Sequence, residues 1–183
     1  KVNRGFDRII NIWGADHHSH VSRLKASMKS LGNSQTHFDF LMIQFVRLLK
    51  DGKDISMSKR SGQYTTIKDL LSLVNKDVVR FMMVTRSSDT HFDFDLNQCL
   101  QDSDENPVFY IQYAHARLCS ILKKADEKHL DFETKKLLSL KTTEEINLAK
   151  KISEYPELLH RVSKNYGVHE LTFFALELSQ LIQ

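Results

Sequence analysis

The part of the sequence that most constrains the fold is a strand, a helix and a second strand at the start of the chain. Residues 6–13 (Phe-Asp-Arg-Ile-Ile-Asn-Ile-Trp) predict a buried strand. Residues 21–31 carry apolar side chains at helical spacing, and a Gly-Asn pair ends that helix. Residues 38–49 predict the second strand. This order indicates a βαβ-like unit, typical of a doubly wound α/β sheet.

The first strand ends at residues 14–18 (Gly-Ala-Asp-His-His). Ligands of doubly wound sheets bind at the carboxyl edge, where an acid such as Asp16 accepts hydrogen bonds from ribose hydroxyls. A turn that caps a helix has the same sequence. His17, His18 and His20 suggest a metal site, but no cysteine or carboxylate cluster completes the ligand set. We therefore expect no protein-bound metal, and we expect at least one of His17 and His18 to donate to a phosphate or ribose oxygen.

A second candidate site lies in residues 50–62. Asp51-Gly52 predicts a tight hairpin, because both central residues must take positive φ. Residues 56–62 (Ser-Met-Ser-Lys-Arg-Ser-Gly) then supply hydroxyls, two adjacent cations and a flexible glycine. These are the groups of a mobile polyphosphate-binding loop. An ordinary solvated turn is the alternative.

Two capped helices are expected after this loop. A hydroxyl at residues 65–66 followed by Asp69 predicts a capping box for a helix over residues 67–74. Asn75 is expected to cap a helix over residues 77–86, which is apolar on nearly all sides and should be buried. The polar and aromatic residues 86–95 are interpreted as a connector between two domains.

The second half of the chain predicts an all-α bundle. Pro107 opens a helix to about residue 124, and residues 143–155, 158–166 and those from 169 onward are also helical in pattern. The expected buried stripe of the first of these helices consists of Val108, Ile111, Leu118 and Ile121. We predict a sheet domain over residues 1–100 and a helical domain over residues 101–183.

Tyr110, Tyr113 and Arg117 share one face of the long helix. Aromatic rings interleaved with cations can bind RNA by stacking and phosphate contact. Helix packing with extended cationic side chains explains the same pattern. The formal charge of +3 permits nucleic-acid binding but does not argue for it.

The remaining composition indicates a globular cytoplasmic protein. The two cysteines, Cys99 and Cys119, lie far apart without a pairing pattern, which suits a reducing compartment. No apolar run approaches the ~20 residues of a membrane helix, so we expect no membrane association. The chain begins at Lys1 directly before an apolar segment and stops within a periodic one. We therefore expect a fragment of a larger protein.

Three stretches carry a family resemblance: residues 12–18 (Ile-Trp-Gly-Ala-Asp-His-His), 57–62 (Met-Ser-Lys-Arg-Ser-Gly) and 104–117 (Asp-Glu-Asn-Pro-Val-Phe-Tyr-Ile-Gln-Tyr-Ala-His-Ala-Arg). In order and spacing the sequence closely resembles the arginyl-tRNA synthetases, which are class I aminoacyl-tRNA synthetases. The resemblance implies the second half of a Rossmann-like nucleotide-binding domain, followed by a truncated all-α anticodon-binding bundle.

The resemblance also implies the reaction. Arginine attacks the α-phosphate of ATP to give arginyl-adenylate and pyrophosphate, and the arginyl group then passes to the terminal adenosine of tRNA(Arg). The expected partners are ATP with Mg²⁺, L-arginine and tRNA(Arg), and the protein is expected to be monomeric. Lys59 is the implied catalytic residue, because a cation on a mobile loop stabilises charge on the departing pyrophosphate. The implied ATP-binding residues are Gly14, Asp16, His17, His18, Met57, Ser58, Lys59 and Arg60.

The sequence departs from the family pattern in three ways. The first lysine of the loop motif is replaced by Ser56, and a glycine after His18 is replaced by Ser19. The chain contains no His-x-Gly-His signature. We therefore expect this chain to be inactive alone, with that half of the site upstream of Lys1. Alternatives are another class I synthetase, such as the cysteinyl enzyme, and a non-catalytic RNA-binding module derived from a synthetase.

Overall fold

The computed structural model describes residues 2–33, 37–55, 66–101, 103, 106–129 and 140–183. The chain begins with a short 3₁₀ helix, η1 (Val2–Arg4), and continues into the predicted βαβ unit. Strand β1 (Arg8–Gly14) leads through η2 (Ala15–His17) into helix α1 (His18–Ser30), and the chain returns as β2 (His37–Ile43). The two strands are parallel, and they pair from Arg8 with His37 to Gly14 with Ile43.

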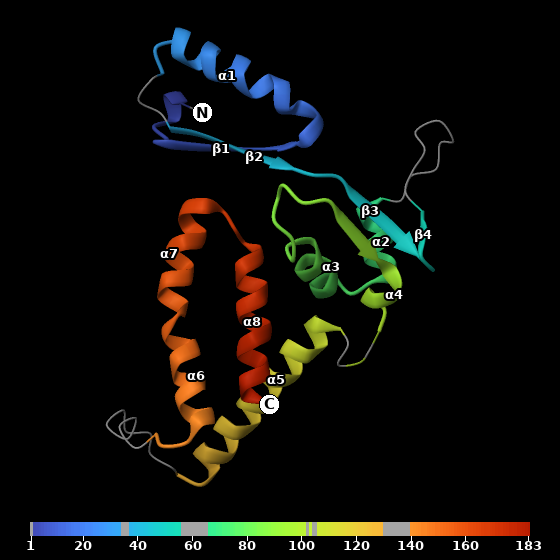
Figure 1. Ribbon diagram of the computed structural model, residues 1–183, viewed down its shortest axis with the longest axis vertical. Helices are drawn as coiled ribbons and strands as arrows, with labels where there is room; N and C mark the ends of the chain where they lie inside the picture. The colour runs from blue at the N-terminus through green and yellow to red at the C-terminus, as the bar shows by residue number, and fades with distance from the viewer. Residues whose placement is uncertain (1, 34–36, 56–65, 102, 104–105, 130–139) are drawn as a thin grey trace.

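Helix α1 covers one face of this strand pair, as Figure 1 shows in blue. The Lys25 ammonium lies 5.5 Å from the centre of the Phe40 ring, so Phe40 faces α1. Trp13 is on the same face, since its ring meets that of Phe40 edge to face at 5.2 Å. Side chains alternate along a strand, and Ile10 and Ile12 of the opposite face are 44% and 65% exposed.

The predicted single strand over residues 38–49 is wrong, because the chain divides it between two sheets. After β2 the chain resumes two residues later as β3 (Val46–Lys50), which pairs with β4 (Lys53–Asp54) and β5 (Phe92–Asp95). The break has a hydrogen-bonding cause. The backbone N–H of Gln44 donates to the Ser88 carbonyl at 2.9 Å. From this residue on, the chain therefore pairs with the segment that leads into β5 and no longer with β1.

The hairpin between β3 and β4 confirms the Asp51-Gly52 prediction. Asp51 has φ 53° and Gly52 has φ 70°, as a two-residue turn with two positive φ values requires. The pairs Leu49 with Asp54 and Lys50 with Lys53 close the hairpin. The chain therefore enters residues 56–65, which lie outside the described part, from a fixed antiparallel strand.

The interpretation of residues 86–95 as a connector is wrong for their second half. Residues 92–95 form β5, which runs parallel to β3 with Val46 opposite Phe92. The physical reason is the period-two alternation of the sequence. Phe92 and Phe94 are buried, whereas Asp93 points outward to a bidentate ion pair with Arg47 at 2.7 and 2.8 Å.

Three helices pack around the second sheet: α2 (Ile67–Leu73), α3 (Lys76–Met83) and α4 (Leu96–Cys99). Both predicted caps are confirmed, with a Thr66–Asp69 capping box on α2 and Asn75 capping α3. The expected burial of α3 on nearly all sides is wrong, because Met83 is 39% exposed. The core of this part contains the buried residues Leu48, Leu70, Val74, Val78, Val79, Met82, Phe92, Phe94, Leu96, Cys99 and Val108.

The predicted helical second half is confirmed, since the described part of it contains four helices. They are α5 (Pro107–Glu127), α6 (Thr143–Ser153), α7 (Tyr155–Asn165) and α8 (His169–Ile182). Figure 1 shows α6 and α7 following one another along one side, with α8 returning beside them and α5 crossing below.

The buried stripe predicted on α5 is only partly correct. Val108 is buried, but Leu118 and Ile121 are 38% and 52% exposed. Ala114 and Ala125 are buried instead. Within the described residues, no helix is long and apolar enough to cross a membrane.

Candidate nucleotide-binding site

The carboxyl edge of β1 is built by a sharp change from strand to helix. Gly14 ends β1 with φ −66° and ψ 150° and is the N-cap of η2. The Asp16 carboxylate folds back over this glycine, because a Cβ built on Gly14 would lie 2.7 Å from Asp16 Oδ1. An alanine at position 14 would therefore displace the carboxylate. The glycine keeps an acidic group at the strand end.

Helix α1 begins at this edge, directly after η2. Its N-cap is His17, at φ −91° and ψ 8°, and His17 makes no side-chain capping bond. The His18 backbone N–H is bonded to the Ala15 carbonyl of η2, so the donors left for a phosphate oxygen at this edge are the exposed imidazole side chains of His17 and His18. The Asp16 and His17 side chains are more than half exposed, and Asp16 Oδ2 lies 3.7 Å from His17 Nε2.

A cavity of about 300 Å³ lies beside this edge and is lined by Trp13, His17 and His20. The two imidazoles meet edge to face with their ring centres 5.7 Å apart. The Trp13 ring rests against Phe40 on the α1 face of the sheet. Aromatic walls beside hydrogen-bonding imidazoles form a surface on which a planar base can stack.

The structure places the predicted residues of this edge as follows. Gly14, Asp16 and His17 lie together at the end of β1. His18 is the first residue of α1, and its backbone N–H donates to the Ala15 carbonyl. His18 is exposed and does not line the cavity. The predicted loop residues Met57, Ser58, Lys59 and Arg60 lie outside the described residues.

The sequence reasoning did not select Trp13 or His20 as site residues. A signal for His20 was present, because residues three apart on a helix share a face and so place His20 beside His17. Trp13 could have been found from its position at the end of an apolar strand, directly before Gly14. Both residues line the cavity. Among the described residues, no group of three or more His, Cys, Asp or Glu is placed to hold a metal ion.

The face of α5 predicted to bind RNA is only partly open. Tyr113 is 59% exposed, and Arg117 one turn later is also exposed. Tyr110 is half-buried, and its carbonyl accepts a hydrogen bond from Gln183 Nε2 at 3.3 Å, which ties α5 to the end of α8. Tyr113 and Arg117 are therefore the accessible members of this face.

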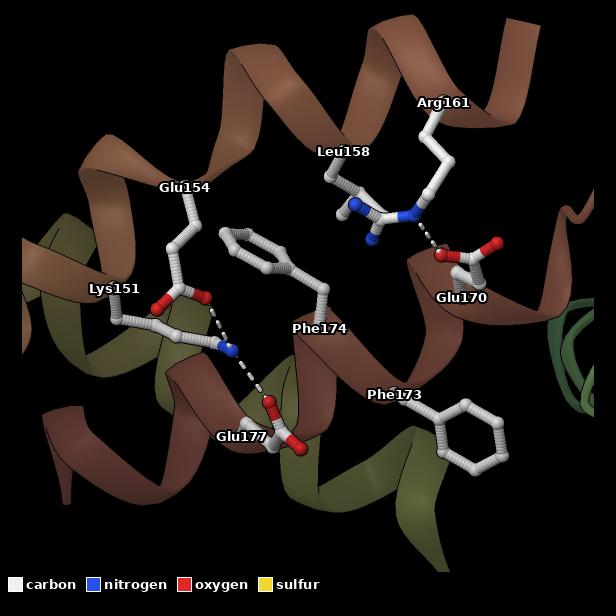
Figure 2. A pocket seen from close by; sticks show the side chains of 8 residues that line it. All are labelled: Lys151, Glu154, Leu158, Arg161, Glu170, Phe173, Phe174 and Glu177. Atoms are coloured by element: carbon white, nitrogen blue, oxygen red, sulfur yellow. Dashed lines mark hydrogen bonds and ion pairs between the residues drawn. The ribbon is translucent and has the colours of Figure 1, made fainter. Parts of the chain in front are cut away.

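A second cavity, of about 220 Å³, opens where α8 passes α6 and α7. Figure 2 shows ion pairs inside it, with Lys151 between two carboxylates and Arg161 beside one. Lys151 Nζ contacts Glu154 at 2.9 Å and Glu177 at 2.5 Å, and Arg161 Nε contacts Glu170 at 2.6 Å. Because both cations are neutralised by carboxylates, this cavity does not suit a phosphate group.

Comparison with known proteins identifies the family. The family model described as tRNA synthetases class I (K) matches residues 12–141, which is more than half of the chain. The chain belongs to the class I tRNA synthetases. A second family model, described as the DALR anticodon binding domain, matches residues 111–183 of this synthetase chain. The two matches overlap over residues 111–141, which include most of α5.

Individual relatives agree with the motif-based resemblance to arginyl-tRNA synthetases. An arginine–tRNA ligase of Desulfitobacterium hafniense is 43% identical over 185 residues, covering 99% of this chain and 33% of the relative. One of Vesicomyosocius okutanii is 45% identical over 179 residues, covering 98% and 31%. The resemblance is confirmed. This synthetase chain spans about a third of the length of these curated relatives.

Solved structures agree with the fold. A crystal structure assigned as an arginyl-tRNA synthetase, from Campylobacter jejuni, matches with a TM-score of 0.84 at 29% identity. The match covers 99% of this synthetase chain and 39% of that protein. The Thermus thermophilus arginyl-tRNA synthetase has a TM-score of 0.69 at 23% identity, covers 96% of this chain and 32% of that protein, and supports the fold alone.

Proposed function

We propose that the full-length protein is an arginine–tRNA ligase. It would form arginyl-adenylate and pyrophosphate from arginine and ATP, and then transfer the arginyl group to the terminal adenosine of tRNA(Arg). The observation that carries this proposal is the 43% identity to an arginine–tRNA ligase over 99% of the chain. We further propose that it acts as a monomer in the cytoplasm.

The two parts of the chain would divide the substrates between them. Residues 1–100 would form the second half of the Rossmann-like catalytic domain, and residues 101–183 the anticodon-binding domain. The match of residues 111–183 to an anticodon-binding family supports the second assignment. Tyr113 and Arg117 on the open face of α5 are the proposed tRNA contacts, with Tyr110 supporting them from its half-buried position.

ATP would bind at the carboxyl edge of β1. The Asp16 carboxylate, which lies over Gly14, would accept hydrogen bonds from the ribose hydroxyls. The exposed His17 and His18 side chains at the start of α1 would lie beside the phosphates. Mg²⁺ would arrive with ATP, bound mainly by phosphate and water oxygens. The exposed Asp16 carboxylate is an oxygen donor of the kind that fits this ion.

The loop residues would act on the leaving group. We propose that Lys59 stabilises the negative charge that develops on the departing pyrophosphate, that Arg60 supports it, and that Met57 and Ser58 contact ATP. The closed hairpin of Asp51-Gly52 supports this proposal, because it fixes the position from which the chain enters the loop. Charge stabilisation of this kind typically contributes ~10²–10³ in rate.

The test is Lys59→Ala in the full-length protein, measured by arginine-dependent exchange of pyrophosphate into ATP and by charging of tRNA(Arg). We expect kcat to fall ~10²–10³-fold while the KM for ATP changes little. Lys53→Ala is the matched control, because Lys53 is an exposed lysine of β4, which precedes the loop in the chain. An unchanged rate of adenylate formation in Lys59→Ala would contradict the proposed role.

The amino-acid specificity is tested in the same assay with arginine, lysine and cysteine as alternative substrates. Exchange with cysteine alone would favour the cysteinyl enzyme. Binding of tRNA without exchange with any amino acid would favour a non-catalytic RNA-binding module. Residues 1–183 alone are expected to show no exchange, because this chain contains no His-x-Gly-His signature.

A further inference from the structure

A cluster of side chains joins the β1–β2 pair to the helical bundle at a distance from the candidate nucleotide site. The Tyr166 hydroxyl, at the end of α7, donates to Asp39 Oδ2 on β2 at 2.5 Å. Arg8 Nε, at the start of β1, donates to the same oxygen at 2.6 Å. The Arg8 guanidinium also lies 5.0 Å from the centre of the Tyr166 ring. We call Arg8, Asp39 and Tyr166 the clasp.

The clasp lies on the face of the sheet opposite α1. Phe40 faces α1, so its neighbour Asp39 points to the other side, toward the turn between α7 and α8 (Figure 1). His37 lies on the same side and contacts Asp39 Oδ1 at 3.0 Å. Arg8 stands six residues before Gly14, which corresponds to roughly 20 Å along an extended strand. The clasp therefore does not touch the nucleotide.

Tyr166 is held in a backbone conformation that its side chain disfavours. Its φ is 59°, in the left-handed region, where a bulky residue is rare and glycine or asparagine would end the helix at lower cost. The turn around it is tightly bonded. Asn165 Oδ1 accepts the Gly167 amide at 2.8 Å, Asn165 Nδ2 donates to Glu170, and Arg161 also donates to Glu170. Strain that the surroundings fix in this way points to a function for the side chain.

We propose that the clasp sets the angle between the sheet that binds the nucleotide and the helical bundle, and that Asp39 and Tyr166 are positioning residues for tRNA. The inference rests on the proposed function, because its substrate must contact both parts at once. Helices α6 and α7 together span roughly 35 Å at 1.5 Å per residue. A rotation of ~5° at the clasp would move their far end by ~3 Å, and displacements of 1 Å can lower rates strongly.

The first test uses kinetics of the full-length protein with Tyr166→Phe, which removes only the hydroxyl. The KM for tRNA(Arg) is expected to rise roughly 3–10-fold, the equivalent of one hydrogen bond, while the KM for ATP stays unchanged. Tyr155→Phe is the matched control, because Tyr155 of the same helix contacts Phe174 through its ring. Asp39→Asn should resemble Tyr166→Phe, and the double variant should be less than additive. A lower melting temperature with an unchanged KM for tRNA would make the clasp purely structural and overturn the proposal.

The second test measures orientation without activity. Spin labels on Lys29→Cys in α1 and Lys150→Cys in α6, both exposed positions, report the distance between the two parts by double electron–electron resonance. Cys119→Ser removes the exposed native thiol, and Cys99 is buried. We expect Tyr166→Phe and Asp39→Asn to broaden or shift the distance distribution, and Tyr155→Phe to leave it unchanged.

The two tests separate the possible failures. Absence of arginylation by the unmodified full-length protein would reject the proposed function, and the distance measurement would still decide whether the clasp fixes the angle. An unchanged distance distribution in both clasp variants would overturn the clasp, whatever the activity of the protein.

Discussion

Asp39→Asn should lower the stability of the protein in a pH-dependent way. Hydrogen bonds from Tyr166 and Arg8, together with the Arg8 charge, lower the pKa of Asp39 from 3.8 to about 2. At ~1.36 kcal/mol per pKa unit this corresponds to about 2.4 kcal/mol. The Asp39 side chain is 19% exposed and Arg8 is 45% exposed, so solvent screens part of the interaction. We expect a loss of about 1–1.5 kcal/mol at pH 7.

The direction of this pH dependence follows from the difference in the pKa of Asp39 between the folded and the unfolded protein. The pKa of Asp39 is lower in the folded protein, so the ionised carboxylate stabilises the fold fully above about pH 5. This contribution is lost as the pH falls toward 2. The difference in unfolding free energy between the unmodified protein and Asp39→Asn should therefore be full at pH 7 and about half as large at pH 3.

Urea unfolding followed by circular dichroism at pH 7, 5 and 3 measures this difference. Asp126→Asn is the control, because Asp126 is an exposed carboxylate on α5, and it should give a difference near zero at each pH. A difference that stays the same from pH 7 to pH 3 would refute the electrostatic reasoning. Such a constant difference would show that the substitution acts through packing. Equal unfolding free energies of the two proteins at every pH would show that the clasp does not form.

Three further predictions concern single residues. Asn106→Ala should lower the free energy of unfolding by about 2–4 kcal/mol in urea titrations, because the 1% exposed Asn106 caps α5 and donates to the Gln101 carbonyl. Iodoacetamide at pH 8 should modify exposed Cys119 and spare Cys99, whose pKa burial raises to about 11, as mass spectrometry can show. ATP should change the fluorescence of Trp13, the single tryptophan of the sequence, and an unchanged emission spectrum would exclude the cavity beside it as the base site.

Local chemistry made the turns and caps of this chain predictable. The Asp51-Gly52 hairpin depends on two positive φ values, and the cap at Asn75 depends on one amide oxygen and the backbone two residues later. The capping box of Thr66 and Asp69 is equally local. Features of this kind need no information from distant residues, and the structure confirms all three.

Predictions failed where a distant segment determines the outcome. Residues 38–49 look like one strand, but Gln44 takes the Ser88 carbonyl as its partner and moves the chain into a second sheet. The clasp pairs residues that lie 127 positions apart. The cavity beside Trp13 required the fold to bring α1 against β1. The loop residues predicted from the family, with Lys59 foremost, remain predictions.

The two-residue interval between β2 and β3 also determines where this chain can change length. An extended strand advances ~3.3 Å per residue and turns its side chains over at each step. One residue inserted at Gln44-Phe45 would move the hairpin by that distance and exchange the faces of β3, so that buried Leu48 would point to solvent. Insertions between the helices of the second half would not exchange the faces of a strand in this way. We therefore infer that the interval between β2 and β3 tolerates no single-residue insertion, because its length sets which face of β3 is buried.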